Sequence, residues 1–131
     1  ALYGMSARDE HIAQAICDAC ETFEVPIFGL SGTLHEEIYT ARGLEFVSEF
    51  FADLDYDETG KLLITREHPA LDPQAVGQKA LRAVRDGIVV TTAGTEVAVK
   101  ANTICIHSDT PNVIAIAQTV RASLDAYMKA A

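Results

Sequence analysis

One short segment of the sequence combines the side chains that proton-transfer chemistry requires. Residues 103–109 have the sequence Thr-Ile-Cys-Ile-His-Ser-Asp, an apolar run that ends on His107 and Asp109. Histidine exchanges a proton near neutral pH, and a nearby carboxylate can orient or activate it. A histidine at a strand end often only bonds a neighbouring loop, however, and Asp before Thr-Pro is a common helix cap. The segment is therefore a candidate catalytic site, with a purely structural role as the alternative.

Two further carboxylates lie at the end of the apolar segment 44–51. Glu49 stands among apolar residues, where a buried carboxylate needs a partner because burying an unpaired charge is costly. Asp53 begins an acidic loop, which by default is solvated surface. Both are candidate catalytic residues beside His107 and Asp109.

The remaining histidines and the Cys-x-x-Cys pair are weaker candidates. His11, His35 and His68 fall on expected helix surfaces or in a loop, so we expect them to be exposed. Cys17 and Cys20 have a spacing that zinc or redox sites use, but no second pair completes four ligands. Because they lie inside an expected helix, we predict that they pack in the core as small apolar side chains.

Positioning these side chains requires an alternation of helices and strands. Such an order predicts an α/β fold with parallel strands and outer helices, and ligands in these folds bind beyond the carboxyl ends of the strands. The apolar runs predict too few buried strands for a closed barrel of eight, so the single domain 1–131 is a small open sheet or part of a barrel completed elsewhere. We expect helices at 6–24, 33–43, 72–87 and from 110 onward, strands at 25–30, 44–51 and 103–107, a hairpin at 88–92 and 96–100, a polar loop at 52–60 and a short extended piece at 61–65.

Composition limits the class of partner. The 131 residues carry 19 acidic and 10 basic side chains, a net charge of −9, which argues against nucleic-acid and anionic-membrane surfaces. No apolar stretch approaches the roughly 18–20 residues that span a bilayer, and no secretory leader is visible. Three cysteines, an odd and sparse set, predict reduced thiols in a cytoplasmic protein.

Three segments, in order along the chain, resemble motifs of the LamB/YcsF family. Ala1-Leu2-Tyr3 is similar to the end of K-P-H-G-A-L-Y-N, and residues 48–53 with Tyr56 are similar to S-E-V-F-A-D-R-x-Y. Residues 103–111 are similar to T-I-C-V-H-G-D-T-P, and residues 29–32 and Arg66 also fit. The resemblance covers essentially all 131 residues and corresponds to the C-terminal half of the family sequence.

The resemblance implies a fold and an activity. The fold is a partial irregular (β/α) barrel, TIM-like and similar to the polysaccharide deacetylase barrel, completed by the N-terminal half or by a second copy of the chain. The activity is that of the A subunit of ATP-dependent 5-oxoprolinase, which acts with B and C subunits to hydrolyse the lactam of 5-oxoproline to L-glutamate. ATP would act through the complex, because the sequence holds no P-loop or other nucleotide-binding motif.

At the matched positions the resemblance also implies roles. His107 would transfer the proton with support from Asp109, while Glu49 or Asp53 would position water or substrate. No metal ligand is implied. Four residues would bind substrate: Tyr3, Ser31, Tyr56 and Arg66.

The chain departs from the family pattern at three places. Leu54 replaces an Arg, Ser108 a Gly and Gly4 an Asn. Loss of a pocket Arg points to a changed substrate or to no activity. Two alternatives therefore stay open: a metal-dependent hydrolase of carbohydrate amides with His107 and Asp109 as ligands, and a non-catalytic half-barrel assembly partner.

Overall fold

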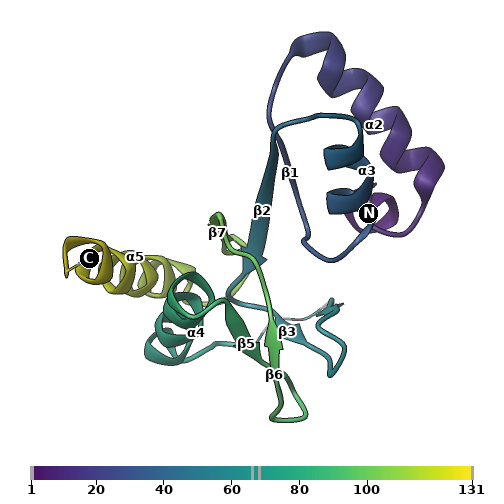
Figure 1. Ribbon diagram of the computed structural model, residues 1–131. Coiled ribbons are helices and arrows are strands. Elements are labelled where there is room, and N and C mark those ends of the chain that lie inside the picture. The colour runs from purple at the N-terminus through teal and green to yellow at the C-terminus, as the bar shows by residue number, and fades with distance from the viewer. Residues whose placement is uncertain (1, 66, 68, 131) are drawn as a thin grey trace. The chain divides into compact units, whose positions relative to one another are not determined.

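The chain divides into two compact units, and the boundary between them in the sequence falls within one strand. The computed structural model describes residues 2–65, 67 and 69–130, so Arg66 and His68 lie outside the described residues. The N-terminal unit comprises residues 1–49 and the C-terminal unit residues 50–131. Helices alternate with strands, and the largest sheet has the strand order β1-β2-β7, which confirms the predicted mixed α/β class (Figure 1). No helix among the described residues is both long and apolar enough to cross a bilayer.

The N-terminal unit contains a parallel strand pair and three helices. Strands β1 (Ile27–Gly29) and β2 (Phe46–Phe51) run parallel, as the sequence predicts, and their register places Gly29 opposite Ser48. The single helix expected at 6–24 is instead two helices, α1 (Leu2–Ser6) and α2 (Glu10–Phe23). The interruption arises because Asp9, and not Ser6, caps α2 by accepting a hydrogen bond from the Ile12 N–H.

Helices α2 and α3 (Leu34–Ala41) bury their apolar faces in the core of this unit. Cys17 is fully buried there and Cys20 packs against the same cluster, which confirms the predicted packing role. Burial raises the pKa of the Cys17 thiol, as expected for an inert structural cysteine. The cluster consists of Ala13, Cys17, Ile27, Ile38 and Tyr39.

Two small antiparallel hairpins and two long helices make up most of the C-terminal unit. The predicted hairpin at 88–100 is present as β5 (Ile88–Val90) and β6 (Glu96–Ala98). The segment expected as a polar loop forms part of a second hairpin, β3 (Asp55–Tyr56) with β4 (Leu62–Leu63). Strand β7 (Thr103–Cys105) is followed by α5 (Val113–Ala130), which begins later than the predicted start at Thr110.

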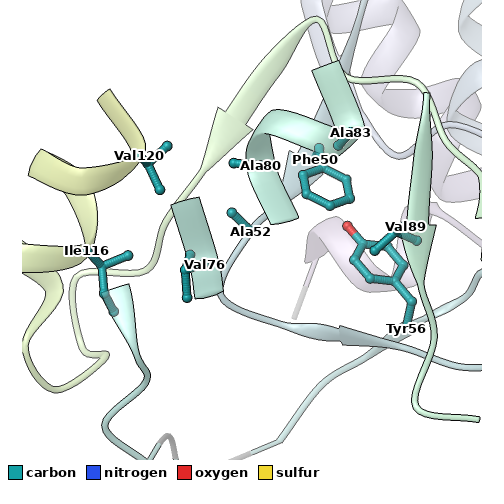
Figure 2. Packing of buried hydrophobic residues seen from close by; sticks show 9 residues of the cluster. All are labelled: Phe50, Ala52, Tyr56, Val76, Ala80, Ala83, Val89, Ile116 and Val120. Carbon is teal, nitrogen blue, oxygen red and sulfur yellow. The ribbon is translucent and has the colours of Figure 1, made fainter. Parts of the chain in front are cut away.

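Helix α4 (Pro73–Arg85) lies at the centre of the C-terminal core. Asp72 caps it by accepting from the Gln74 N–H, and Pro73 occupies the first turn, as the sequence predicts. Helix α4 packs against α5, and the buried side chains of α4 belong to one cluster with Phe50, Tyr56 and Val89 (Figure 2). The two helices pack closely because Gly77 has no side chain: a Cβ there would lie 3.0 Å from Ser123 Oγ.

Candidate active site

His107 and the buried Asp53 form a hydrogen-bonded pair in the C-terminal unit. Asp53 lies two residues after the end of β2, and His107 lies two residues after the end of β7, so both are just beyond strand ends. Asp53 Oδ1 is 3.0 Å from His107 Nδ1, and Asp53 Oδ2 accepts from the His107 backbone N–H at 2.7 Å. Thr110 Oγ1 also donates to Oδ2, at 3.0 Å. One carboxylate therefore receives three hydrogen bonds from the segment 107–110.

The environment keeps Asp53 ionised. Burial of its fully enclosed side chain acts to raise the pKa, but the hydrogen bonds from His107 and Thr110 outweigh it. The net effect places the pKa of Asp53 below its ordinary value. An ionised carboxylate only accepts hydrogen bonds, so the nitrogen facing it, His107 Nδ1, must be the donor.

This donor assignment fixes the chemistry that His107 can perform. With the proton on Nδ1, a neutral ring has its lone pair on Nε2 and can accept a proton there. The ring stacks on Phe51, with centroids 5.3 Å apart, and its side chain is 33% exposed. His107 is thus held by a carboxylate on one nitrogen and an aromatic face, an arrangement suited to general acid–base catalysis.

The structure differs from the sequence prediction in which acid supports His107. Asp109 is exposed, and within the described residues its carboxylate makes no hydrogen bond or ion pair. Asp53 takes the place beside the ring, although it is 54 residues away in sequence. Thr110 is a residue that the sequence pattern assigned only to a helix start. The Thr110-Pro111 pair marks this position in the sequence, but the sequence alone does not show that Thr110 bonds Asp53.

A second polar cluster lies in the N-terminal unit. The Tyr3 hydroxyl donates to Glu49 Oε2 at 2.8 Å, which gives the carboxylate the partner that its position in β2 demands. Ser31 Oγ lies 2.9 Å from the Oγ of Ser48, a buried residue opposite the end of β1. Three predicted site residues, Tyr3, Ser31 and Glu49, therefore sit in hydrogen-bonded pairs beyond or near strand ends of the same unit.

Comparison with known proteins decides the family. The model of the LamB/YcsF family matches residues 1–130. The chain belongs to the LamB/YcsF family. Among its relatives, a 5-oxoprolinase A subunit of Pseudomonas aeruginosa is 38% identical over 127 residues, covering 95% of this chain and 50% of the relative. The 5-oxoprolinase A subunit of Thermus thermophilus is 39% identical over 130 residues, covering 95% and 52%.

A solved structure in the family has the same fold. The crystal structure of the lactam utilization protein from Thermus thermophilus matches with a TM-score of 0.85 at 35% identity. The match covers 96% of this chain and 51% of that one. This LamB/YcsF chain thus spans about half the length of the relatives that it matches.

Not every position that the family pattern marks has a side chain available to a ligand. Tyr56 is 4% exposed, and its hydroxyl accepts a hydrogen bond from the Phe51 N–H at 3.0 Å. Its ring stacks on Phe50 with centroids 5.3 Å apart. The structure therefore places Tyr56 in the core, where it holds the turn that carries Asp53. Arg66 lies outside the described residues.

Tyr56→Phe tests this structural role. Removing the hydroxyl deletes the hydrogen bond that the buried Phe51 N–H donates to it, and a lost hydrogen bond costs about 0.5–1.5 kcal/mol. We expect the free energy of unfolding, measured by denaturant titration, to fall by that amount. Thr59→Val, in the exposed turn after Tyr56, is the control for a lost hydroxyl; an equal loss in both variants would contradict a special role for Tyr56.

A lysine lies beside the position where the family pattern has Arg. Leu54 is buried, and the Lys79 ammonium donates to its carbonyl oxygen and lies 3.6 Å from Asp55 Oδ1. Burial lowers the pKa of Lys79, while Asp55 acts in the opposite direction. These residues and Asp53 help line a cavity of about 420 Å³ over α4. Sequence patterns did not single out Lys79, because a lysine inside an amphipathic helix carries no positional signal.

The N-termini of α2, α3 and α4 are each capped by a side chain of this protein. Phosphate sites use unpaired N–H groups at helix N-termini, but the first turns of three helices are closed by their own side chains. Asp9 caps α2, Thr33 caps α3 and Asp72 caps α4. Two of these caps are carboxylates, which repel phosphate. Among the described residues, no group of three His, Cys, Asp or Glu side chains is arranged to hold a metal ion.

Proposed function

We propose that this chain forms part of the A subunit of a 5-oxoprolinase, which hydrolyses the lactam of 5-oxoproline to L-glutamate together with B and C subunits. The observation that carries the proposal is the Asp53–His107 pair, built from the two longest family motifs. Relatives that are named as A subunits of 5-oxoprolinase support the substrate class. We further propose a cytoplasmic location, in keeping with the thiol cysteines.

In the proposed reaction His107 moves the proton. Its Nε2 removes a proton from water as the oxygen attacks the lactam carbonyl carbon, and Asp53 stabilises the imidazolium that results. When the carbon–nitrogen bond breaks, the imidazolium returns the proton to the departing ring nitrogen. Water is consumed, and the product is an open-chain amino acid. Thr110 keeps Asp53 in place through its hydroxyl.

Roles for the N-terminal unit follow from the family motifs. We propose that Glu49 and Tyr3 bind substrate polar groups and that Ser31 assists them. Asp109, which is exposed, is assigned as a group that contacts substrate or water. ATP is assigned to the complex as a whole, since the sequence of this chain holds no P-loop or other nucleotide-binding motif.

We also propose that the chain is part of a TIM-like barrel of the polysaccharide deacetylase kind. The parallel pair β1–β2 and the fold shared with half of the Thermus thermophilus lactam utilization protein support this. The complement would be the other half of the family sequence or a second copy of the chain.

The direct test is an assay of the protein in its native complex. We expect the complex purified through this chain to form glutamate from 5-oxoproline, measured by NMR, when ATP is supplied. Copurification of B and C subunits, identified by mass spectrometry, is the second expected result. A complex that contains these subunits yet forms no glutamate would overturn the proposed substrate.

A further inference from the structure

A continuous chain of hydrogen bonds runs through the N-terminal unit and ends on Tyr3. His35, expected on a helix surface, is instead 1% exposed. Its Nδ1 lies 3.1 Å from the backbone nitrogen of Leu30, and its Nε2 lies 2.7 Å from Ser6 Oγ. The Ser6 hydroxyl donates to the Tyr3 carbonyl at 2.9 Å. The exposed-surface prediction for His35 was wrong because these partners come from α1 and from the loop after β1.

The chemistry of the partners determines which group donates in each hydrogen bond of this network. A backbone N–H can only donate, so Nδ1 must accept from Leu30. A neutral ring then has its hydrogen on Nε2 and donates it to Ser6, whose own hydrogen goes to Tyr3. Burial lowers the pKa of His35, in keeping with a neutral ring.

This direction excludes one use of the Ser6–His35 pair. A serine nucleophile needs an unprotonated imidazole nitrogen to take its hydrogen, and here the nitrogen that faces Ser6 carries a hydrogen itself. Ser6 is also 1% exposed. The pair is therefore suited to holding structure and not to attacking a substrate.

The same ring also contacts Tyr3 through its side chain. The rings of Tyr3 and His35 pack edge to face, with centroids 4.9 Å apart, while Tyr39 stacks on His35 at 5.1 Å. The close approach of His35 to strand β1 requires Gly29, since a Cβ at that position would lie 2.8 Å from His35 Cβ. Helix α1 has only five residues and needs such tertiary anchors, because a helix this short is unstable alone.

We infer that His35, through Ser6, is a positioning residue that holds Tyr3 in place to donate its hydroxyl to Glu49. The inference adds a residue to the proposed function and rests on that function only for its test by glutamate formation. His35 fixes Tyr3 at two points, the carbonyl through Ser6 and the ring by direct contact. Loss of the His35–Ser6 or the Ser6–Tyr3 hydrogen bond releases the short helix α1. The fraction of molecules in which Tyr3 donates to Glu49 then falls.

Two conservative variants and Ser6→Ala test the inference in the full-length protein within its complex. His35→Gln can still present an N–H where Nε2 stands, whereas His35→Asn can only reach the Leu30 N–H. We expect glutamate formation to fall about 10-fold in His35→Asn and Ser6→Ala and to stay within about 3-fold in His35→Gln. If His35 acts through Tyr3, adding His35→Asn to Tyr3→Phe lowers the rate no further.

A spectroscopic readout separates this inference from the proposed activity. A long-range ¹H–¹⁵N spectrum of the labelled protein should show His35 with a hydrogen on Nε2 and none on Nδ1. It should also show nuclear Overhauser contacts between the Tyr3 and His35 rings that persist in Ser6→Thr and weaken in Ser6→Ala. A hydrogen on Nδ1, or unchanged contacts in Ser6→Ala, would overturn the inference even if 5-oxoproline is not the substrate. Fully additive rates in the double variant would overturn it as well.

Discussion

Replacing His107 by alanine is expected to lower the rate of glutamate formation by the complex about 10²- to 10⁴-fold, the range in which a general acid–base group contributes. The side chain is partly exposed and its removal leaves no large cavity, so folding should be retained. The measurement is the steady-state rate with 5-oxoproline, with circular dichroism as the check on folding.

The matched control for this variant is His11→Ala. His11 is an exposed histidine in the first turn of α2, and it belongs to no site described above. Its removal should leave the rate unchanged. Full activity in His107→Ala would exclude a proton-transfer role for this residue.

Asp53→Asn should have the second largest effect, because it changes both the tautomer of His107 and the packing of the turn. The amide nitrogen donates where the carboxylate accepted, so at least one of the three donors loses its partner. We expect the rate to fall about 10²- to 10⁴-fold and the free energy of unfolding to fall by about 1–3 kcal/mol.

Asp109→Asn discriminates between the two acids that could support His107. The geometry predicts a much smaller loss of rate than in Asp53→Asn, since the exposed Asp109 carboxylate does not touch the ring. Equal losses in the two variants would favour the assignment made from sequence and contradict the one made from the structure.

The lowered pKa of Asp53 also predicts a pH dependence of stability. In the unfolded chain this carboxyl has its ordinary pKa of about 3.9, whereas the folded-state pKa is lower. The unfolded state therefore binds the proton first as pH falls, and the contribution of Asp53 is complete above about pH 4 and lost below it. We expect the difference in unfolding free energy between the wild type and Asp53→Asn to narrow as pH decreases below about 4. A constant difference throughout the acid range would contradict this.

Much of the local structure could be predicted from sequence because its causes are local. Asp72-Pro73 sets the start of α4, and Ala93-Gly94-Thr95 sets the hairpin β5–β6. The apolar runs before Ser31 and His107 predicted strands, and strand ends predicted where polar groups gather. The predicted start of the first long helix was wrong, because Ser6 lies at the end of α1 and the side chain of Asp9 caps α2.

The pairing of distant residues could not be predicted in the same way. Asp109 was the acid expected to support His107, but Asp53 reaches the ring, and hydrophobic patterns do not predict such a long-range pair. Asp53 was expected in a solvated loop, but it is buried together with its neighbours Leu54 and Tyr56. The prediction for His35 failed for the same reason, because its partners Ser6 and Leu30 lie in other elements.

The position of the ring hydrogen on His107 tests the proposed site most directly, because Asp53 must hold this ring with Nε2 as the proton acceptor. A long-range ¹H–¹⁵N spectrum of the protein reports which ring nitrogen carries the hydrogen. We predict a hydrogen on Nδ1 of His107, opposite to the Nε2 hydrogen predicted for His35 in the same spectrum, and loss of this preference in Asp53→Asn. A hydrogen on Nε2 of His107 in the wild-type protein would contradict the proposed site.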